Sequence, residues 1–244
     1  MDTKLTGKTR IESDLIGARE IPAEALYGVQ TLRGIENFSI SKFRLSEYPL
    51  FIKGLAITKM AAAMANFELG LLTVEQKDAI IAACGEILDG KHHDQFPVDM
   101  IQGGAGTTTN MNANEVIANR ALELMGHERG EYQYCSPNDH VNCSQSTNDA
   151  YPTAIHIGMY FKHLQLLPHL EELIASFRKK GEEFSQIIKM GRTQLEDAVP
   201  MTLGQTFNGF ASILQDEIAH LNEAAADFLV VNMGATAIGT GICA

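Results

Sequence analysis

Residues 149–180, DAYPTAIHIGMYFKHLQLLPHLEELIASFRKK, decide the fold because they form one helical pattern much longer than an average helix. Pro152 falls in the first turn, where proline is tolerated, and Pro168 predicts a kink. A second long pattern covers residues 200–233. Its apolar stripe consists of Phe207, Phe210, Leu214, Ile218, Leu221, Ala225 and Phe228. Helices of this length indicate a bundle or a coiled coil.

Shorter helices are predicted in the first half of the chain. Residues 49–69 are rich in alanine, leucine and methionine, and a glycine follows them. Thr73 and Gln76 form a capping box for a helix that extends to about residue 88. A third helix is predicted over residues 112–125, with the next glycine as its stop.

The fold class is therefore mainly α, because strand signals are weak and confined to short pieces before Pro49. We expect a helical N-terminal domain over residues 1–140, followed by an incomplete central bundle of long helices over residues 141–244. Two apolar-striped helices cannot close a bundle by themselves. The sequence predicts that further helices, from this chain or from partner chains, complete it.

Composition excludes several classes of protein. The chain has 244 residues, of which 45% are hydrophobic and 20% charged, values typical of a folded domain rather than a disordered one. A net charge of -11 with scattered basic residues argues against nucleic-acid binding. We find no secretory signal and no apolar stretch of membrane-spanning length, and four cysteines without CxxC spacing indicate reduced thiols. We expect a cytoplasmic protein.

Three polar segments could hold a carboxylate. QGGAGTTTN, at residues 102–110, combines glycines, threonine hydroxyls and a helix start, which together can cradle an anion, but taken alone it is better explained as a capped flexible turn. SQSTND, at residues 144–149, has more polar side chains than an N-cap needs, and a ligand site and a capped helix start both explain it. GRTQLEDAVP, at residues 191–200, is interpreted as a polar turn between the two long helices. Thr193 and Gln194 could supply a hydroxyl and an amide there, but taken alone the segment is better explained as a plain loop.

Other polar groups are weaker candidates. His92, His93 and Asp94 could bind a metal but lie in a polar loop, so a solvated loop is the simpler interpretation. His156 and His163, one heptad apart, are interpreted as packed or interface residues. The glycine-rich residues 234–241 lack phosphate-binding spacing. We predict no metal site and no cofactor.

Taken in order, five segments resemble the aspartase/class II fumarase superfamily. Three are GGAGTTTNMNANEVIANRA (103–121), SPNDHVNCSQSTNDAYPTAIHI (136–157) and KMGRTQLEDAVPMTLGQ (189–205). Two more are GAREIPAEALYGVQT (17–31) and NMGATAIGTG (232–241). The resemblance spans nearly the whole chain. It implies an α-helical N-terminal domain and long helices that assemble into a tetrameric central bundle, with active sites built from several subunits.

The resemblance also implies a substrate and a set of residues that bind it. The substrate would be a small dicarboxylate, L-aspartate or fumarate, and the partners would be further copies of the chain in a homotetramer. The positions that match the family's pocket are Thr107, Ser146, Thr147, Asn148, Thr193 and Gln194. Of these, Thr193 and Gln194 are the candidates for a catalytic role.

Gln194 favours an ammonia-lyase over a hydratase. Fumarases of this superfamily carry histidine at this place, and an amide cannot shuttle a proton to a departing hydroxide. Ser136 also replaces the histidine of an accessory anion site in fumarases. We therefore expect reversible deamination of L-aspartate to fumarate and ammonia through an aci-carboxylate intermediate. The alternatives are a fumarate hydratase acting on L-malate and a non-catalytic helical assembly fragment.

The family's general base is a serine in a GSxxMPxKxNP motif, which these 244 residues do not contain. We therefore expect the chain to be inactive alone.

Overall fold

The computed structural model describes residues 7–242 and divides them into two compact units. Among the described residues, unit 1 comprises residues 7–159 together with residues 231–242, and unit 2 comprises Tyr160–Val230. This division by contacts lies further along the chain than the boundary predicted between residues 140 and 141, which stays a prediction. The difference arises because the first turns of a long helix pack within unit 1.

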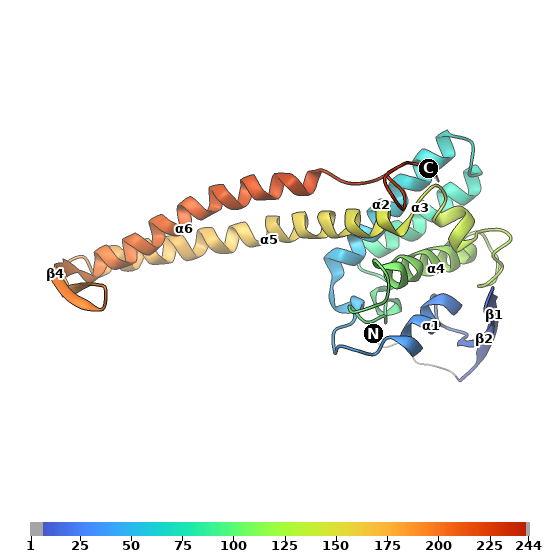
Figure 1. Cartoon of the computed structure of the whole chain (residues 1–244), viewed down its shortest axis with the longest axis horizontal. Helices are drawn as coiled ribbons and strands as arrows, with labels where there is room; N and C mark the ends of the chain where they lie inside the picture. The colour runs from blue at the N-terminus through green and yellow to red at the C-terminus, as the bar shows by residue number, and fades with distance from the viewer. Residues whose placement is uncertain (1–6, 243–244) are drawn as a thin grey trace. The chain divides into compact units, whose positions relative to one another are not determined.

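Unit 1 begins with a small sheet and a short helix. Strands β1 (Thr9–Asp14) and β2 (Gly17–Pro22) form an antiparallel hairpin, as the weak strand signals before Pro49 predicted (Figure 1). Helix α1 (Val29–Asn37) follows, and a short 3-10 turn, Leu45–Glu47, leads into the helical core.

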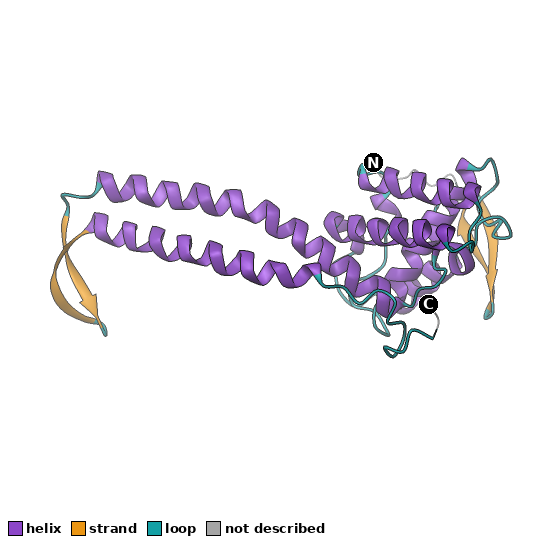
Figure 2. Cartoon of the chain, turned by 90° about the horizontal axis from the view of Figure 1, so that it is seen from above, coloured by secondary structure: helices purple, strands orange, loops and turns teal. Residues whose placement is uncertain are grey.

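The core of unit 1 is formed by three helices. They are α2 (Pro49–Glu68), α3 (Val74–Leu88) and α4 (Thr107–Leu124). Fully buried Ile52, Ile80 and Ile117, one from each helix, belong to a single hydrophobic cluster. The cluster hides apolar surface from water, which is the main favourable contribution to folding. The fold class predicted from the sequence, mainly α, is confirmed (Figure 2).

The predicted capping box of α3 is confirmed. The hydroxyl of Thr73 accepts from the N–H of Gln76 at 3.2 Å, and the Gln76 side chain accepts from the N–H of Thr73 at 3.0 Å. The predicted start of α4 was wrong, because the helix begins at Thr107 and not at residue 112. Threonine and asparagine are weak helix formers, so propensity placed the start too late. Most residues of this helix are buried, and their packing stabilises the helix despite the weak helix propensity of its first residues.

Two buried carboxylates cap the N-terminus of α1. Glu115 of α4 accepts from the N–H groups of Gly28, Gln30 and Thr31 at 2.8, 2.8 and 3.0 Å. Glu12 of β1 accepts from the N–H of Val29 at 3.2 Å. Anionic groups at this end are favoured by the helix dipole, and burial raises the pKa of Glu115 against the effect of these bonds. The sheet, α1 and α4 are thereby joined.

Unit 2 is an antiparallel pair of long helices. Helix α5 (Thr147–Glu183) starts in unit 1 and continues into unit 2 without interruption at Pro168, and α6 (Leu203–Ala226) lies alongside it (Figures 1 and 2). Phe177 of α5 packs between Phe207 and Phe210 of α6, with ring centroids 6.0 and 5.7 Å apart. The second helix is shorter than predicted. It ends at Ala226, and a short 3-10 turn, Asp227–Leu229, follows it.

The polar turn predicted at residues 191–200 is instead part of a β-hairpin. Strands β3 (Ile188–Thr193) and β4 (Glu196–Thr202) pair antiparallel, and Gln194 and Leu195 form the two-residue turn. Both turn residues have positive φ, 50° and 67°, which a type I′ hairpin requires but which normally favours Asn-Gly. The missing Asn-Gly signal explains the wrong prediction, and Pro200 is tolerated because both strands are edges.

The prediction that no apolar stretch reaches membrane-spanning length was wrong, because α2 is long and apolar enough to cross a membrane by length and composition alone. Half of its most apolar 18-residue stretch is buried inside unit 1, and the buried core helix of a soluble protein can have the same length and composition. The buried polar side chains Lys59 and Asn66 on this helix hydrogen-bond to other parts of unit 1. The helix is therefore a core element of this unit.

We predict that Gly28→Ala destabilises the protein by about 1–3 kcal/mol. A methyl group at Gly28 would lie 2.6 Å from Glu12 Oε2 and 2.8 Å from Glu115 Cδ, so one of the capping carboxylates would have to move. Gly85→Ala in α3 is the matched control. Its added methyl meets no atom within 4 Å, and helix propensity predicts stabilisation of about 0.5–1 kcal/mol. Apparent melting temperatures measure both effects, and an unchanged value for Gly28→Ala would contradict the capping role.

We also predict that alkylating reagents modify Cys143 and spare Cys84 and Cys135. Burial raises the pKa of both spared thiols to about 12, so at pH 8 neither exposes a reactive thiolate. Cys143 is only half-buried, and Cys243 lies outside the described residues. Mass-spectrometric mapping of iodoacetamide adducts on the folded protein measures this. Modification of Cys84 or Cys135 as fast as Cys143 would contradict it.

Candidate functional site

Thr107, the first predicted site residue, is also the first residue of α4. Gly106 precedes it with a φ of +91°, a conformation that side chains rarely adopt. The Gln102 side chain caps the helix by accepting from the N–H of Thr109 at 2.7 Å and donating to its hydroxyl at 2.6 Å. Thr107 itself is exposed. The first turn of α4 therefore presents a threonine and the positive end of a helix dipole.

Ser146, Thr147 and Asn148 form the start of α5. The Ser146 N–H donates to Asp149 Oδ2 at 2.7 Å, and the Asn148 N–H donates to the Ser146 hydroxyl at 3.2 Å, so both side chains cap this helix end. All three predicted residues are half-buried, whereas Asp149 is fully buried. Capping accounts for Ser146 and Asp149, whereas the side chains of Thr147 and Asn148 contact other segments of unit 1.

The starts of α4 and α5 are in contact. The Asn110 side chain, in the first turn of α4, donates to the Thr147 hydroxyl at 3.3 Å. Gly106 lies so close to the ring of Tyr151 in α5 that a side chain at position 106 would clash with it. The structure thus brings Thr107 and the segment 146–148 to two adjacent helix N-termini. Two such ends with hydroxyl and amide donors suit an anion such as a carboxylate.

Residues 232–237, which overlap the glycine-rich segment 234–241 that was given little weight as a site, also belong to this region. The Asn232 side chain donates to the Asn148 carbonyl at 2.8 Å, and the Asn148 side chain donates to the Ala237 carbonyl at 2.7 Å. The Thr236 N–H donates to Asp149 Oδ1 at 2.8 Å. Thr236 has a φ of 60°, unusual for a β-branched residue, and its buried hydroxyl has no partner among the described residues. The positive φ of Thr236 could not be predicted from the sequence.

Thr193 and Gln194 lie in the β3–β4 hairpin of unit 2 and are exposed. Gln194 is held at positive φ at the hairpin turn, beside a fully exposed Leu195. Such a conformation costs roughly 1–2 kcal/mol per residue, and strain of this kind is concentrated at functional positions. Within one chain, the structure assigns these two residues to a different unit from Thr107 and the segment 146–148.

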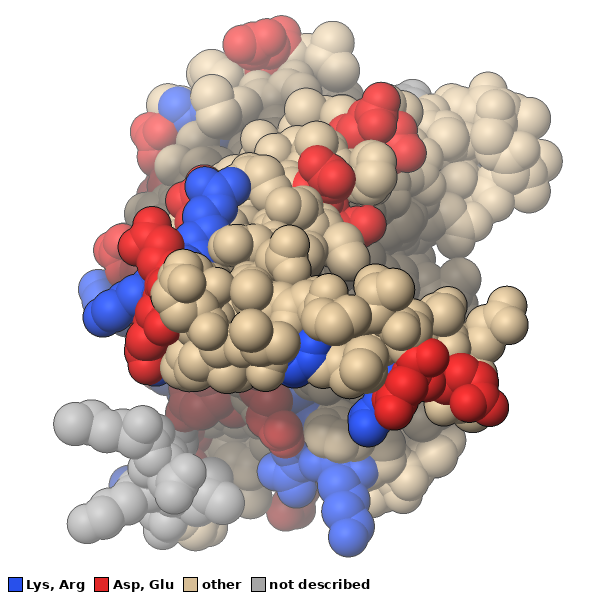
Figure 3. Space-filling view, turned by 90° about the vertical axis from the view of Figure 1, so that its left-hand side faces the viewer, with Lys and Arg blue, Asp and Glu red and all other residues tan. Residues whose placement is uncertain are grey.

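The other candidates of the sequence analysis have structural partners. In the loop after α3, His92 pairs with Glu86 at 2.7 Å and His93 contacts the Ile87 carbonyl at 2.9 Å. In unit 2, His163 contacts Asn222 at 3.0 Å. Among residues 7–242, no group of three or more His, Cys, Asp and Glu side chains could hold a metal ion. On the face shown in Figure 3, acidic and basic side chains are interspersed among neutral ones.

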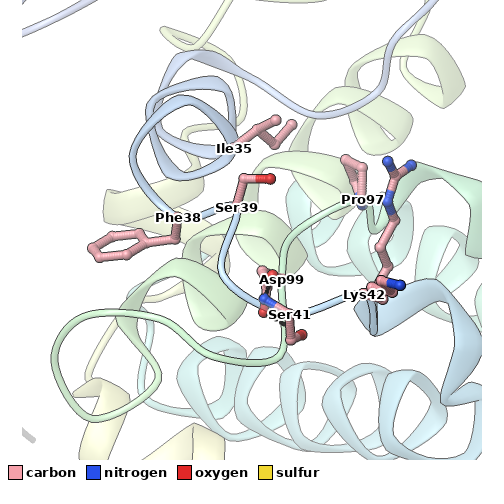
Figure 4. Close-up of a pocket in the computed structure, with 8 residues that line it drawn as sticks. Ile35, Phe38, Ser39, Ser41, Lys42, Pro97 and Asp99 are labelled. Carbon is pink, nitrogen blue, oxygen red and sulfur yellow. Dashed lines mark hydrogen bonds between the residues drawn. The ribbon is translucent and has the colours of Figure 1, made fainter.

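A pocket of about 350 Å³ lies elsewhere in unit 1, between the segment after α1 and the segment around Asp99 (Figure 4). Phe38, Lys42 and Arg44 are among its lining residues, and none of the six predicted site residues is. Asp99 uses its carboxylate to accept from Ile40, Ser41 and Ile101, so it organises the loop. The pocket is therefore distinct from the site at the helix ends.

Comparison with known proteins identifies relatives of this arrangement. A protein-family model described as lyase matches residues 17–244. An aspartate ammonia-lyase of Pseudomonas canavaninivorans is 58% identical over 96% of this chain and 49% of its own length. The aspartate ammonia-lyase of Escherichia coli strain K12 is 56% identical over 98% of this chain and 50% of its own length. The chain thus spans about half the length of the curated relatives it matches.

Solved structures agree with the sequence comparison. The structure described as fumarate lyase:delta crystallin from Brucella melitensis bound to cobalt has a TM-score of 0.94 and 54% identity. It matches 97% of this chain and 52% of its own. A class II fumarase from Schistosoma mansoni has a TM-score of 0.90 at 38% identity, over 97% of this chain and 50% of its own. This chain therefore belongs to the lyase family that the matching model describes, the aspartase/class II fumarase superfamily that its motifs resemble.

Proposed function

We propose that the full-length protein is an aspartate ammonia-lyase, which reversibly deaminates L-aspartate to fumarate and ammonia. The observation that carries the proposal is the 56–58% identity to proteins of that name over 96–98% of this chain. The arrangement of α4 and α5 supports it, because two helix N-termini with hydroxyl and amide groups suit a dicarboxylate.

The proposed mechanism requires donors near a carboxylate. Removal of the proton next to a carboxylate places extra negative charge on it, which gives an aci-carboxylate intermediate. Preorganised donors that bind this dianionic group more strongly than the substrate lower the barrier. Thr107, Ser146, Thr147 and Asn148 would hold the carboxylates in this way. Ammonia then leaves as the carbon–nitrogen bond breaks.

Thr193 and Gln194 would complete the pocket and contact the amino group. Because the Gln194 amide can donate and accept hydrogen bonds but cannot transfer a proton, it suits a departing amine better than a departing hydroxide. This residue favours the ammonia-lyase over the runner-up, a fumarate hydratase that forms fumarate from L-malate.

A site that includes the hairpin would be built from several copies of the chain in a homotetramer. Unit 2 leaves a large apolar surface uncovered by its own residues, since Phe210 is 47% and Ile213 62% exposed. Together with Phe177 and Leu214 they line an apolar hollow of about 350 Å³. Burial of such residues by helices of other copies would contribute about 25 cal/mol per Å² of apolar surface. Copies of the long helices are the proposed occupants of this surface.

We further propose that a serine outside these residues supplies the general base, so that residues 1–244 alone turn over no substrate. Turnover of L-aspartate by this chain alone would contradict that part of the proposal.

The test offers the full-length protein L-aspartate and L-malate in parallel and follows fumarate by its ultraviolet absorbance. We expect fumarate and ammonia from L-aspartate and no turnover of L-malate. Gln194→Ala should lower kcat/KM for L-aspartate about 10- to 100-fold, whereas Gln186→Ala, at an exposed glutamine before the hairpin, should leave it unchanged. Turnover of L-malate alone would make the protein a hydratase and remove the argument from Gln194.

A further inference from the structure

Lys59 of α2 is a lysine whose side chain is 0% exposed. Its Nζ donates to Asn142 Oδ1 at 2.8 Å and to Gln145 Oε1 at 3.0 Å. Across the described part of the chain, no carboxylate forms an ion pair with it. The ammonium group is therefore held by two neutral amide oxygens, both from the loop that leads into α5.

Asn142 connects Lys59 to the start of α5. Its Oδ1 also accepts from Asn110 Nδ2 at 3.1 Å, and its own Nδ2 donates to the Gln145 carbonyl at 3.0 Å. Asn110 Nδ2 in turn donates to the Thr147 hydroxyl at 3.3 Å. A continuous chain of hydrogen bonds thus links Lys59, Asn142, Asn110 and Thr147. It joins α2, α4 and α5 behind the two helix ends.

This arrangement is costly for stability. Burial lowers the pKa of Lys59 to about 7. The facing groups whose charge would raise this pKa are Cys84 on α3 and Asp149 on α5. Burial keeps the Cys84 thiol neutral below its pKa of about 12, and the Asp149 carboxylate already accepts from the Ser146 and Thr236 N–H groups. An apolar side chain of equal length would fill the space without the desolvation penalty. The lysine therefore contributes something other than stability.

We propose that Lys59 is a positioning residue, which fixes the Thr147 hydroxyl and the segment 146–148 against the dicarboxylate through Asn142 and Asn110. Lys59 does not reach the substrate itself in this account. Because Asn110 Nδ2 donates to the Thr147 hydroxyl, one lone pair of that hydroxyl is occupied, and its proton and its other lone pair remain available. The proposal rests on the proposed function of the same site.

The first experiment compares Lys59→Met with Lys53→Met in the full-length protein. Lys53 lies on the same helix, is half-buried and has no hydrogen-bond or ion-pair partner among the described residues. We expect Lys59→Met to lower kcat/KM for L-aspartate about 10- to 100-fold, because small misplacements of binding groups are costly in rate. Lys53→Met should stay within about twofold of the unaltered protein. An unchanged kcat/KM in a folded Lys59→Met protein overturns the proposal.

A second pair of variants keeps the proposal testable if Lys59→Met fails to fold. Asn142→Asp retains an oxygen that accepts from both Lys59 and Asn110, whereas Asn142→Leu retains none. We expect Asn142→Asp to keep most of the kcat/KM that Asn142→Leu loses. If the role of Asn142 were purely structural, both variants would have a lower melting temperature, and folded Asn142→Asp and folded Asn142→Leu would have equal kcat/KM. That result overturns the proposal.

The orientation of Thr147 can also be measured without activity. In a crystal structure of the full-length Lys59→Met protein, we expect the Asn110–Thr147 hydrogen bond to be lost or the hydroxyl to be rotated. An unchanged hydroxyl overturns the proposal, even if the protein turns over neither L-aspartate nor L-malate. Absence of turnover in the unaltered protein, by contrast, contradicts the proposed function and leaves this structural readout intact.

Discussion

The contact between the starts of α4 and α5 is the constraint on which the rest of the candidate site depends. It requires glycine at position 106, because the Tyr151 ring occupies the space of any side chain and the backbone has a φ of +91°. It also requires Asn110 to be buried where it reaches Thr147. The positive ends of two helix dipoles thereby face one region. Their mutual repulsion is unfavourable unless an anion binds there.

Buried polar side chains maintain this contact at a cost in stability. Lys59 and Asn110 are buried and Asn142 is half-buried, and hydrogen bonds join the three side chains. Asn110 Oδ1 is buried without a partner among the described residues, which is unfavourable in the protein interior. Burial of the hydrophobic cluster of α2, α3 and α4 stabilises unit 1 and offsets the free-energy cost of this polar network. The same arrangement explains why a helix as apolar as α2 carries a lysine at its centre: it supports the site rather than the core.

Much of the fold could be predicted from the sequence. Composition, periodicity and capping signals predicted α2, α3 and α5. Thr107 and the segment 146–148 were named from the family resemblance, and their role in binding stays a prediction. The β3–β4 hairpin could not be predicted, because its turn, Gln194–Leu195, lacks the residues that favour positive φ. The roles of Lys59 and Thr236 could not be predicted either, since each depends on contacts between residues far apart in the sequence.

The central claim is that one dicarboxylate is bound by Thr107 and the segment 146–148 of one subunit together with Thr193 and Gln194 of others. A crystal structure of the full-length protein with bound fumarate tests it most directly. The account predicts that fumarate lies at the adjoining starts of α4 and α5, with a hairpin from another copy beside it. Fumarate bound elsewhere, for example at Lys42 and Arg44 in the other pocket of unit 1, would contradict it.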